Sequence, residues 1–385
     1  MSISYVGVDD TTIDLFEGQY PVPQGISYNS YVIMDEKIAI MDTIDKRTTD
    51  EWLENLKSVL KDRSADYLIV SHMEPDHASN IEVLTKLYPQ MKVVASAKAF
   101  PMIGQFFPNL DLADKTITVK EGDTLCLGQH TLQFFMAPMV HWPEVMMTYE
   151  QKEKILFSAD AFGKFGALQK QDAWDDEARR YYLNIVGKFG TQVQNTLKKL
   201  ANLEISAIYP LHGPVLSENL GYYLEKYQIW SSYRPEEDGV LIAYASIYGN
   251  TKAVAMQLAD YIQEKYQGPV ILADLAREEE SQVLANAFRF PVTVFAASSY
   301  EAGVFTPMEN FLRHLGHKLF QNRTIGLIEN GSWALSAAKS MKTLLDGMKN
   351  IEILEPTVSV KSTLNADSQK ALHDLGDAIL AKLNV

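Results

Sequence analysis

The feature that most constrains this chain is a group of metal-binding side-chain types placed directly after an apolar strand. The apolar run Tyr67–Val70 leads without a spacer into a segment that contains His72, Glu74, Asp76 and His77. Residues two apart in an extended or turning loop project to the same side, so His72 and Glu74 can share one metal. Asp76 and His77 point elsewhere and can serve a second metal. The segment therefore predicts a loop at the C-terminal end of a strand that supplies imidazole and carboxylate ligands.

Three later residues of the same types also follow directly on apolar runs: His141, Asp160 and His212. Strand ends meet at one edge of a sheet, where loops converge. A lone histidine there is usually a hydrogen-bonded core or surface residue, and Asp160 alone could cap a helix. Charged groups after four separate apolar runs would each cost several kcal/mol if buried unpaired, which favours a shared metal site. Two metals with one shared carboxylate suit the seven candidates: His72, Glu74, Asp76, His77, His141, Asp160 and His212.

Charge and cysteine content exclude several classes of protein. The 385 residues include 49 Asp and Glu against 35 Lys and Arg, and the net charge of -14 repels a phosphate backbone, so no nucleic acid is expected as a partner. Cys126 is the only cysteine, which excludes an internal disulfide and a thiolate metal cluster and fits a reducing cytoplasm. No stretch reaches the roughly 18 uncharged apolar residues of a membrane span, and the start lacks a secretion signal, so we expect a soluble, unexported protein.

The chain is predicted to form two α/β domains, 1–238 and 239–385. A short polar segment with Pro and Gly, Tyr233–Gly239, interrupts the apolar pattern between them. In the second domain, five strand-like runs alternate with helical periods, which predicts a doubly wound parallel sheet. The runs lie at 240–245, 270–272, 292–297, 324–328 and 358–360.

The first domain has a different pattern. Two adjacent strand-like runs, 27–34 and 37–41, precede an amphipathic helix at 50–61. Several further strands follow, some paired by turns such as Glu121-Gly122-Asp123, with helices between them. We therefore expect a layered α/β sandwich with mixed sheets.

Three loops in the second domain point to a bound mononucleotide. The first, at 246–252, places hydroxyls, a glycine and free backbone N–H groups at a helix N-terminus, which can hold a phosphate without a lysine. It matches neither a Walker sequence nor the Gly-x-Gly-x-x-Gly of dinucleotide folds, and alone it is also ordinary turn chemistry. Tyr300 and Trp333, in the two later loops, can stack on a flat ring. The candidate residues are Ser246, Ile247, Tyr248, Gly249, Asn250, Thr251, Ser298, Ser299, Tyr300, Glu301, Ala302, Gly303, Asn330, Gly331, Ser332, Trp333 and Ala334.

In this order along the chain, the two sets of residues resemble the flavodiiron proteins, and the resemblance covers nearly the whole chain. It implies a metallo-β-lactamase-like αβ/βα sandwich followed by a flavodoxin-like doubly wound parallel sheet that binds FMN. The motifs that carry it in the first domain are His72-x-Glu74-x-Asp76-His77, His141-Trp142-Pro143, Asp160-Ala161-Phe162-Gly163 and His212-Gly213-Pro214.

The resemblance implies two irons, each held by three residues, with one carboxylate between them. The ligand sets are His72, Glu74 and His141, then Asp76, His77 and His212, with Asp160 as the bridge. In some family members water takes the place of the ligand that corresponds to His77. The hydrolytic branch of the fold has His where this chain has Glu74, and an oxygen ligand favours iron over zinc. The alternative is a zinc-dependent hydrolase with a flavodoxin partner domain.

The resemblance also implies an activity and partners. Two ferrous ions and one reduced FMN can together donate four electrons. This number suits the reduction of O₂ to water, which uses four electrons, and the reduction of two NO to N₂O, which uses two. A head-to-tail homodimer, or a dimer of such dimers, would bring flavin and iron together. The chain ends soon after its last helical period, so we expect a separate electron donor such as rubredoxin. A sensor or electron carrier is a third possibility. Tyr182 is a candidate for the wall of the gas pocket, although it can equally pack in a helix core, and Gln24 is another candidate.

Overall fold

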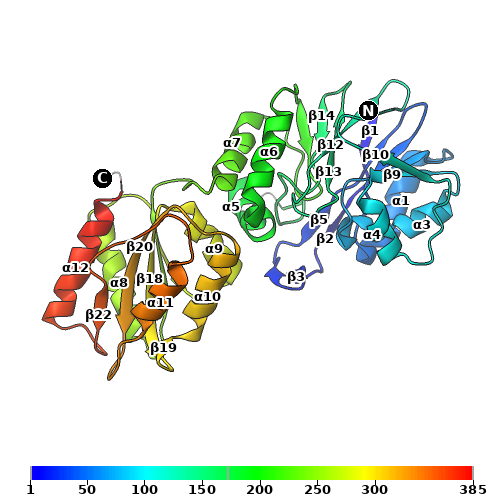
Figure 1. Ribbon diagram of the computed structural model, residues 1–385. Coiled ribbons are helices and arrows are strands. Elements are labelled where there is room, and N and C mark those ends of the chain that lie inside the picture. Colours follow the sequence, from blue (N-terminus) through cyan, green and yellow to red (C-terminus); the bar gives the residue numbers. More distant parts are fainter. Residues whose placement is uncertain (1, 171–172, 384–385) are drawn as a thin grey trace. The chain divides into compact units, whose positions relative to one another are not determined.

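A computed structural model of the chain describes residues 2–170 and 173–383. The described chain divides into two compact units, unit 1 at Met1–Gln228 and unit 2 at Ile229–Val385 (Figure 1). The division falls inside helix α7 (Leu220–Ser231), ahead of the predicted domain boundary after residue 238. That predicted boundary lies just before the first strand of unit 2.

Unit 1 contains a six-stranded and a five-stranded sheet. The first has the order β1 (Ile3–Tyr5), β6 (Tyr31–Ile33), β7 (Ala39–Met41), β8 (Tyr67–Val70), β9 (Lys92–Ser96) and β10 (Thr116–Val119). The second has the order β11 (Thr124–Cys126), β12 (Thr131–Met136), β13 (Met146–Glu150), β14 (Ile155–Phe157) and β15 (Ala207–Tyr209). Both sheets mix parallel and antiparallel neighbours, as predicted.

Apolar side chains from both sheets fill the space between them. Ile33, Met41 and Ile69 from the first sheet share one buried cluster with Phe134 and Phe157 from the second. Because side chains alternate between the faces of a strand, the opposite faces are left for helices. Figure 1 shows these helices along the two sheets. They are α1 (Thr49–Leu60), α3 (Ile81–Leu87) and α4 (Ala99–Phe106) on one side, and α5 (Trp174–Tyr181), α6 (Gly190–Leu200) and α7 on the other.

The amphipathic helix predicted at 50–61 is confirmed as α1. Its buried residues Trp52, Leu56 and Leu60 recur every four positions on one face. The predicted hairpin at Glu121-Gly122-Asp123 is wrong, because this turn leads from β10 in the first sheet to β11 in the second. Gly122 has a φ of +80°, which suits this change of direction. Two small sheets, β2 (Val8–Asp10) with β5 (Ile26–Tyr28) and β3 (Leu15–Phe16) with β4 (Tyr20–Pro21), complete unit 1.

Unit 2 is built on a parallel sheet in the order β17, β16, β18, β20 and β21, with β22 paired to β20. The five predicted runs are all strands, extended by a few residues in three cases. Two short strands were not predicted. They are β19 (Gly303–Val304), which is antiparallel to β18, and β21 (Ile351–Ile353), which is parallel to β20. The remaining strands are β16 (Val240–Ala245), β17 (Val270–Asp274), β18 (Val292–Tyr300), β20 (Arg323–Asn330) and β22 (Val358–Val360).

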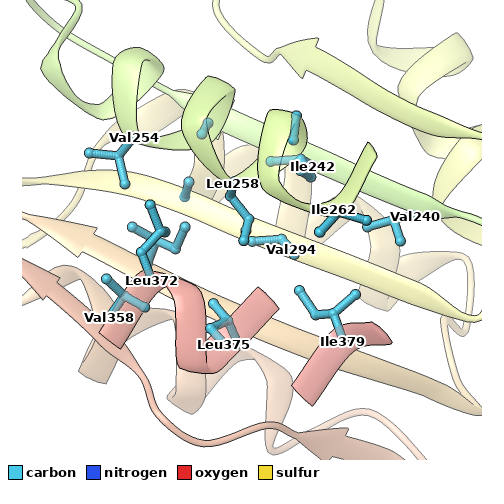
Figure 2. Close-up of a cluster of buried hydrophobic side chains, with 14 of the residues drawn as sticks. Val240, Ile242, Val254, Leu258, Ile262, Val294, Val358, Leu372, Leu375 and Ile379 are labelled. Carbon is cyan, nitrogen blue, oxygen red and sulfur yellow. The ribbon is translucent and has the colours of Figure 1, made fainter. Parts of the chain in front are cut away.

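Helices cover both faces of this sheet, which is the doubly wound arrangement. On one face, α8 (Asn250–Gln263) and α12 (Ala366–Leu380) pack over Val240, Ile242 and Val294 (Figure 2). Leu258 of α8 and Leu375 of α12 both belong to this buried cluster. The other face carries α9 (Glu280–Arg289), α10 (Thr306–His317) and α11 (Ala337–Leu345). Within the described residues of both units, no helix combines the length and the apolar character needed to span a bilayer.

Candidate metal centre and cofactor pocket

All seven predicted ligands come together in unit 1. The loop after β8 supplies the first two, and α2 (Pro75–Ala78), a single helical turn with Pro75 at its start, supplies the next two. The loops after β12, β14 and β15 supply the other three. The ligand atoms form two groups, each within 4.8 Å. The first cluster is His72, Glu74, His141 and Asp160, and the second cluster is Asp76, His77 and His212.

Asp160 lies between the two clusters and directs one carboxylate oxygen at each. Its Oδ2 is 3.1 Å from Nε2 of His72 and 3.3 Å from Nε2 of His141. Its Oδ1 is 3.3 Å from Nε2 of His77 and 3.8 Å from Nε2 of His212. A carboxylate in this position can hold a cation on each of its oxygens.

The second cluster and the bridging Asp160 have buried polar atoms without hydrogen-bond partners, which a bound cation would satisfy. The Nε2 atoms of His77 and His212 are 3.1 Å apart, and Asp76 Oδ2 is 3.3 and 3.2 Å from them. All these side chains are buried, yet neither oxygen of Asp76 or of Asp160 makes a hydrogen bond. Buried carboxylates without partners are costly, and lone pairs that converge on one point are typical of a metal site. The residues present therefore fit a metal pair.

The outer nitrogens of two histidine ligands are held so that the inner ones are free to bind. His72 Nδ1 is 2.8 Å from Glu144 Oε1, and His212 Nδ1 is 2.7 Å from the carbonyl oxygen of Ser27. Each Nδ1–H donates to its acceptor, which leaves a lone pair on Nε2. Glu144 Oε1 also accepts from the backbone N–H of Met73 at 2.8 Å.

Asp42 holds the same loop from the other side. It follows β7, is buried, and its Oδ1 accepts from the backbone N–H of Ser71 at 2.6 Å. Ser30 Oγ in turn donates to the carbonyl oxygen of Asp42 at 3.0 Å. Sequence reasoning missed both Asp42 and Glu144. Asp42 could have been found because it follows a strand as His72 does, and Glu144 because it lies three residues after His141.

The buried acids of the site shift the pKa values of several candidate ligands upward. Burial opposes protonation of His72, but the charge of Asp160 outweighs it and raises the pKa of His72 well above its usual range. Asp160 and Glu74 likewise outweigh burial and raise the pKa of His141 to about 9. Burial, followed by the charges of Glu74 and Asp160, raises the pKa of Asp76 to about 7. Protons on these groups balance the acidic charge, and divalent cations would replace them.

A tyrosine does reach the metal cluster, but it is the neighbour of the predicted one. The Tyr181 ring centroid lies 5.5 Å from that of His212, and burial together with the charges of Asp160 and other acids raises the pKa of Tyr181 well above its usual value. Tyr182 is buried against Tyr227, with ring centroids 5.0 Å apart. Gln24 is exposed, and its carbonyl oxygen accepts from the backbone of Ala167.

Glu17, at the tip of the β3–β4 hairpin, is a further acid at the first cluster that sequence reasoning missed. Its side chain stays accessible to solvent, but partial burial and then the nearby charge of Glu74 raise the pKa of Glu17 to about 7. Its neighbour Phe16 is buried edge-on against His212 at 5.4 Å between ring centroids. The hairpin therefore contributes both an apolar wall and an acidic group to the site.

Unit 2 contains a cavity of about 480 Å³ at the carboxyl end of its sheet, formed by the three predicted loops. All the predicted cofactor-binding residues line it except Gly249 and Gly303. Ser336 and Ser362 line it as well and were not predicted. Two hydrogen bonds hold Ser362 against Asn330 of the third loop. The backbone N–H of Ser362 donates to Asn330 Oδ1 at 3.0 Å, and Asn330 Nδ2 donates to the carbonyl oxygen of Ser362 at 3.0 Å.

The first loop of the cavity has the geometry of a phosphate site. Gly249, with a φ of +93°, donates its N–H to Ser246 Oγ at 3.1 Å, and α8 begins directly after it. Thr251 Oγ1 lies 2.9 Å from Ser298 Oγ, which ties the first loop to the second. Among the described residues that line the cavity, none carries a positive charge. A phosphate there would depend on hydroxyls, backbone N–H groups and the helix N-terminus.

Aromatic rings surround the same cavity. Tyr248 and Trp333 are 93% and 96% exposed, and Tyr300 is 45% exposed. Such uncovered ring faces beside a cavity are suited to stacking on a planar ligand. The cavity therefore combines a phosphate-binding end with faces for a flat ring.

Comparison with known proteins identifies relatives of this chain. Residues 26–213 match the family model described as ODP family beta lactamase. An anaerobic nitric oxide reductase flavorubredoxin from Salmonella arizonae is 29% identical over 356 residues, which cover 89% of this chain and 74% of that protein. An uncharacterized protein from Methanocaldococcus jannaschii is 32% identical over 269 residues, which cover 68% of this chain and 67% of that protein.

Solved structures extend the match to the whole chain. The rubredoxin oxygen:oxidoreductase of Desulfovibrio gigas superposes with a TM-score of 0.91 at 25% identity, over 100% of this chain and 98% of that one. The flavodiiron protein of Giardia intestinalis shares the fold, with a TM-score of 0.90 at 23% identity, over 99% of this chain and 95% of that one. The predicted metallo-β-lactamase-like and flavodoxin-like folds are thus confirmed. The chain belongs to the flavodiiron proteins, a family of oxidoreductases that carry FMN and a diiron site.

Proposed function

We propose that this chain reduces a diatomic gas, O₂ or NO, at a pair of irons in unit 1, with FMN in the cavity of unit 2 as the source of electrons. The observation that carries the proposal is the position of Asp160, with one oxygen facing each cluster. In a purely structural ion-pair network there is no need for four histidine nitrogens to converge on one buried carboxylate. A bridged metal pair explains this convergence.

The proposed iron ligands are those predicted from the sequence, three to each iron, with Asp160 between them. When bound, the two irons and reduced FMN would supply up to four electrons, and the irons would polarise the gas. The protein contributes the geometry. Glu144 and the Ser27 carbonyl hold His72 and His212 in the tautomer that leaves Nε2 free. Phe16 and Tyr181, packed around His212, exclude water from one side.

The proposed role of unit 2 is to bind FMN through its three loops. The phosphate would lie at the start of α8, beside the Ser246 and Thr251 hydroxyls, and the flavin ring against the aromatic faces around the cavity. The absence of a cation among the described lining residues favours a single phosphate held by N–H groups. Without such a cation, the additional negative charge of a dinucleotide pyrophosphate would gain little stabilisation.

Electron supply and assembly complete the proposal. One relative is named a rubredoxin oxygen:oxidoreductase and another a flavorubredoxin, which supports rubredoxin or a similar carrier as the electron donor. We further propose a cytoplasmic head-to-tail homodimer, in which the flavin of one subunit serves the irons of the other.

A zinc hydrolase is the competing function, and Glu74 argues against it. Its Oε2 lies 3.2 Å from His72 Nε2 and 3.0 Å from His141 Nε2, so a carboxylate completes the first cluster. Each cluster then has its own carboxylate in addition to Asp160, and such oxygen-rich sites favour iron.

The test is anaerobic reduction of the purified protein, followed by timed additions of O₂ or NO in parallel. We expect about two irons and one FMN per chain, with fast consumption of at least one gas. Glu74→Ala should lose iron and gas consumption, whereas the surface control Glu82→Ala should keep both. Stoichiometric zinc, or gas consumption that survives Glu74→Ala, would refute the proposal.

A further inference from the structure

The outer partners of the two clusters differ in charge. His72, in the first cluster, donates to the carboxylate of Glu144, whereas His212, in the second cluster, donates to the neutral carbonyl of Ser27. The other anionic ligands are balanced, because Glu74 belongs to the first cluster, Asp76 to the second, and Asp160 faces both. Glu144 is therefore a carboxylate in direct contact with a ligand of the first cluster, whereas His212 in the second cluster has a neutral partner.

Glu144 is fixed in place by the fold. Its side chain is 0% exposed, and Oε1 accepts from two donors, the His72 ring and the Met73 backbone N–H. Its own carbonyl oxygen accepts from Ser96 Oγ at 2.7 Å, which anchors the backbone. Asp42, the other buried acid at this loop, bonds to the backbone N–H of Ser71 and to neither histidine ring. Of these two acids, Glu144 is the one whose carboxylate contacts an imidazole ligand.

We infer that Glu144 is a positioning residue that makes the two irons unequal, so that the iron of the first cluster is oxidised before the iron of the second. A carboxylate that accepts from Nδ1–H increases the electron density of the imidazole and makes Nε2 a more basic ligand. A more basic ligand set stabilises Fe³⁺ relative to Fe²⁺. A neutral carbonyl acceptor has a smaller effect, so the second iron keeps the higher reduction potential.

The inference rests on the proposed function, since it requires the iron pair. In a redox titration, removal of one electron from the diferrous pair by a mediator dye gives one Fe³⁺ and one Fe²⁺. With unequal potentials, the Fe³⁺ resides in the first cluster and this half-oxidised state accumulates. With equal potentials, much of the protein would be fully reduced or fully oxidised at the midpoint.

The test replaces Glu144 by glutamine in the complete iron- and FMN-containing protein. In Glu144→Gln the amide oxygen can still accept from His72 and Met73, so both irons should stay bound while the charge is lost. The matched control is Glu150→Gln, because Glu150 is a 0% exposed carboxylate 3.0 Å from His130 Nδ1 at the far end of β13. The carboxylate of Glu150 accepts hydrogen bonds from the backbone N–H groups of Lys152 and Glu153, and none of these described partners is a proposed iron ligand.

The readouts are iron content, the two iron potentials, and the low-temperature EPR intensity of the half-oxidised pair. We expect two irons in all three proteins. In Glu144→Gln the lower potential should rise by about 60 to 120 mV, which corresponds to a 10- to 100-fold loss of Fe³⁺ stabilisation, and the EPR intensity should fall. Glu150→Gln should match the parent protein.

Two results would overturn the inference in distinguishable ways. If all three proteins hold two irons and Glu144→Gln leaves both potentials unchanged, or shifts only the higher one, the inference fails and the proposed function stands. If the parent protein holds fewer than two irons, the proposed function fails and the inference with it.

Discussion

At the scale of single residues, Asp160 connects more of the metal site than any other side chain. Its two oxygens face four histidine nitrogens at 3.1 to 3.8 Å. Asp160→Asn keeps the size of the side chain but removes the charge from both clusters. We therefore expect iron content to fall from about two to one or fewer per chain, measured on protein purified anaerobically. Asp111→Asn, an exposed change in the same unit, should retain both irons, and an Asp160→Asn protein with two irons would contradict this role.

The charges of the site also predict that metal uptake depends on pH. The acids around His141 raise its pKa to about 9, so below that pH the metal must displace a proton from it. Apparent affinity should therefore rise with pH up to about 9, by roughly tenfold per pH unit for each proton displaced. The measurement is proton release into a weakly buffered indicator solution when ferrous iron is added to metal-free protein under anaerobic conditions. Uptake without proton release would contradict the assignment.

The clustering of the seven candidate ligands could be predicted because each stands beside a local signal, an apolar run that ends in His, Asp or Glu. Glu144 and Asp42 could not be predicted with the same ease, because their roles depend on contacts across the fold. Glu144 meets His72 only after β8 and the loop before β13 come together. The choice between Tyr181 and Tyr182 depends on helical rotation, because successive residues of a helix point about 100° apart.

At the scale of elements, a hydrogen bond between the hydroxyls of Thr251 and Ser298 joins the first loop of the proposed FMN cavity to the second. Thr251→Val keeps the shape of this buried side chain but removes the hydroxyl that joins the two loops. We expect FMN affinity to fall by about tenfold, equivalent to about 1.4 kcal/mol, in fluorescence titrations of the flavin-free protein. Thr343→Val on α11, where the hydroxyl bonds only to the Lys339 carbonyl, is the control. Equal FMN affinity in both variants would show that the loop contact is dispensable.

The parallel strands of unit 2 were predictable because buried strands read as short continuous apolar runs. By contrast, β19 and β21 form by pairing with neighbouring strands, and their sequences are too short to show a strand pattern. The turn at Gly122 shows another limit, because a glycine turn between two strands indicates a change of direction but not which sheet receives the second strand.

At the scale of the whole molecule, the two units have separate buried cores, and each unit contains its own candidate site. Leu258→Ala should lower the stability of unit 2 by about 2 to 5 kcal/mol, because Leu258 is fully buried between α8 and α12 (Figure 2). FMN should be lost at lower denaturant concentration while iron stays bound. The measurement follows flavin fluorescence and iron absorbance in parallel during denaturation. A parallel loss of iron would show that the cores are not independent.

The two-unit organisation was predicted from the polar segment at 233–239, but the compact units divide within α7, whose apolar pattern continues across the division. A contiguous helix gives the sequence no composition change at that point, so its last turn cannot be assigned to a unit by pattern alone.

The most direct test of the account is anomalous diffraction at the iron absorption edge from crystals of the anaerobically purified protein. The account predicts two iron peaks in unit 1, one within each cluster, with one oxygen of Asp160 bound to each iron. A single peak, a peak only at the zinc edge, or two irons without contact to Asp160 would contradict it.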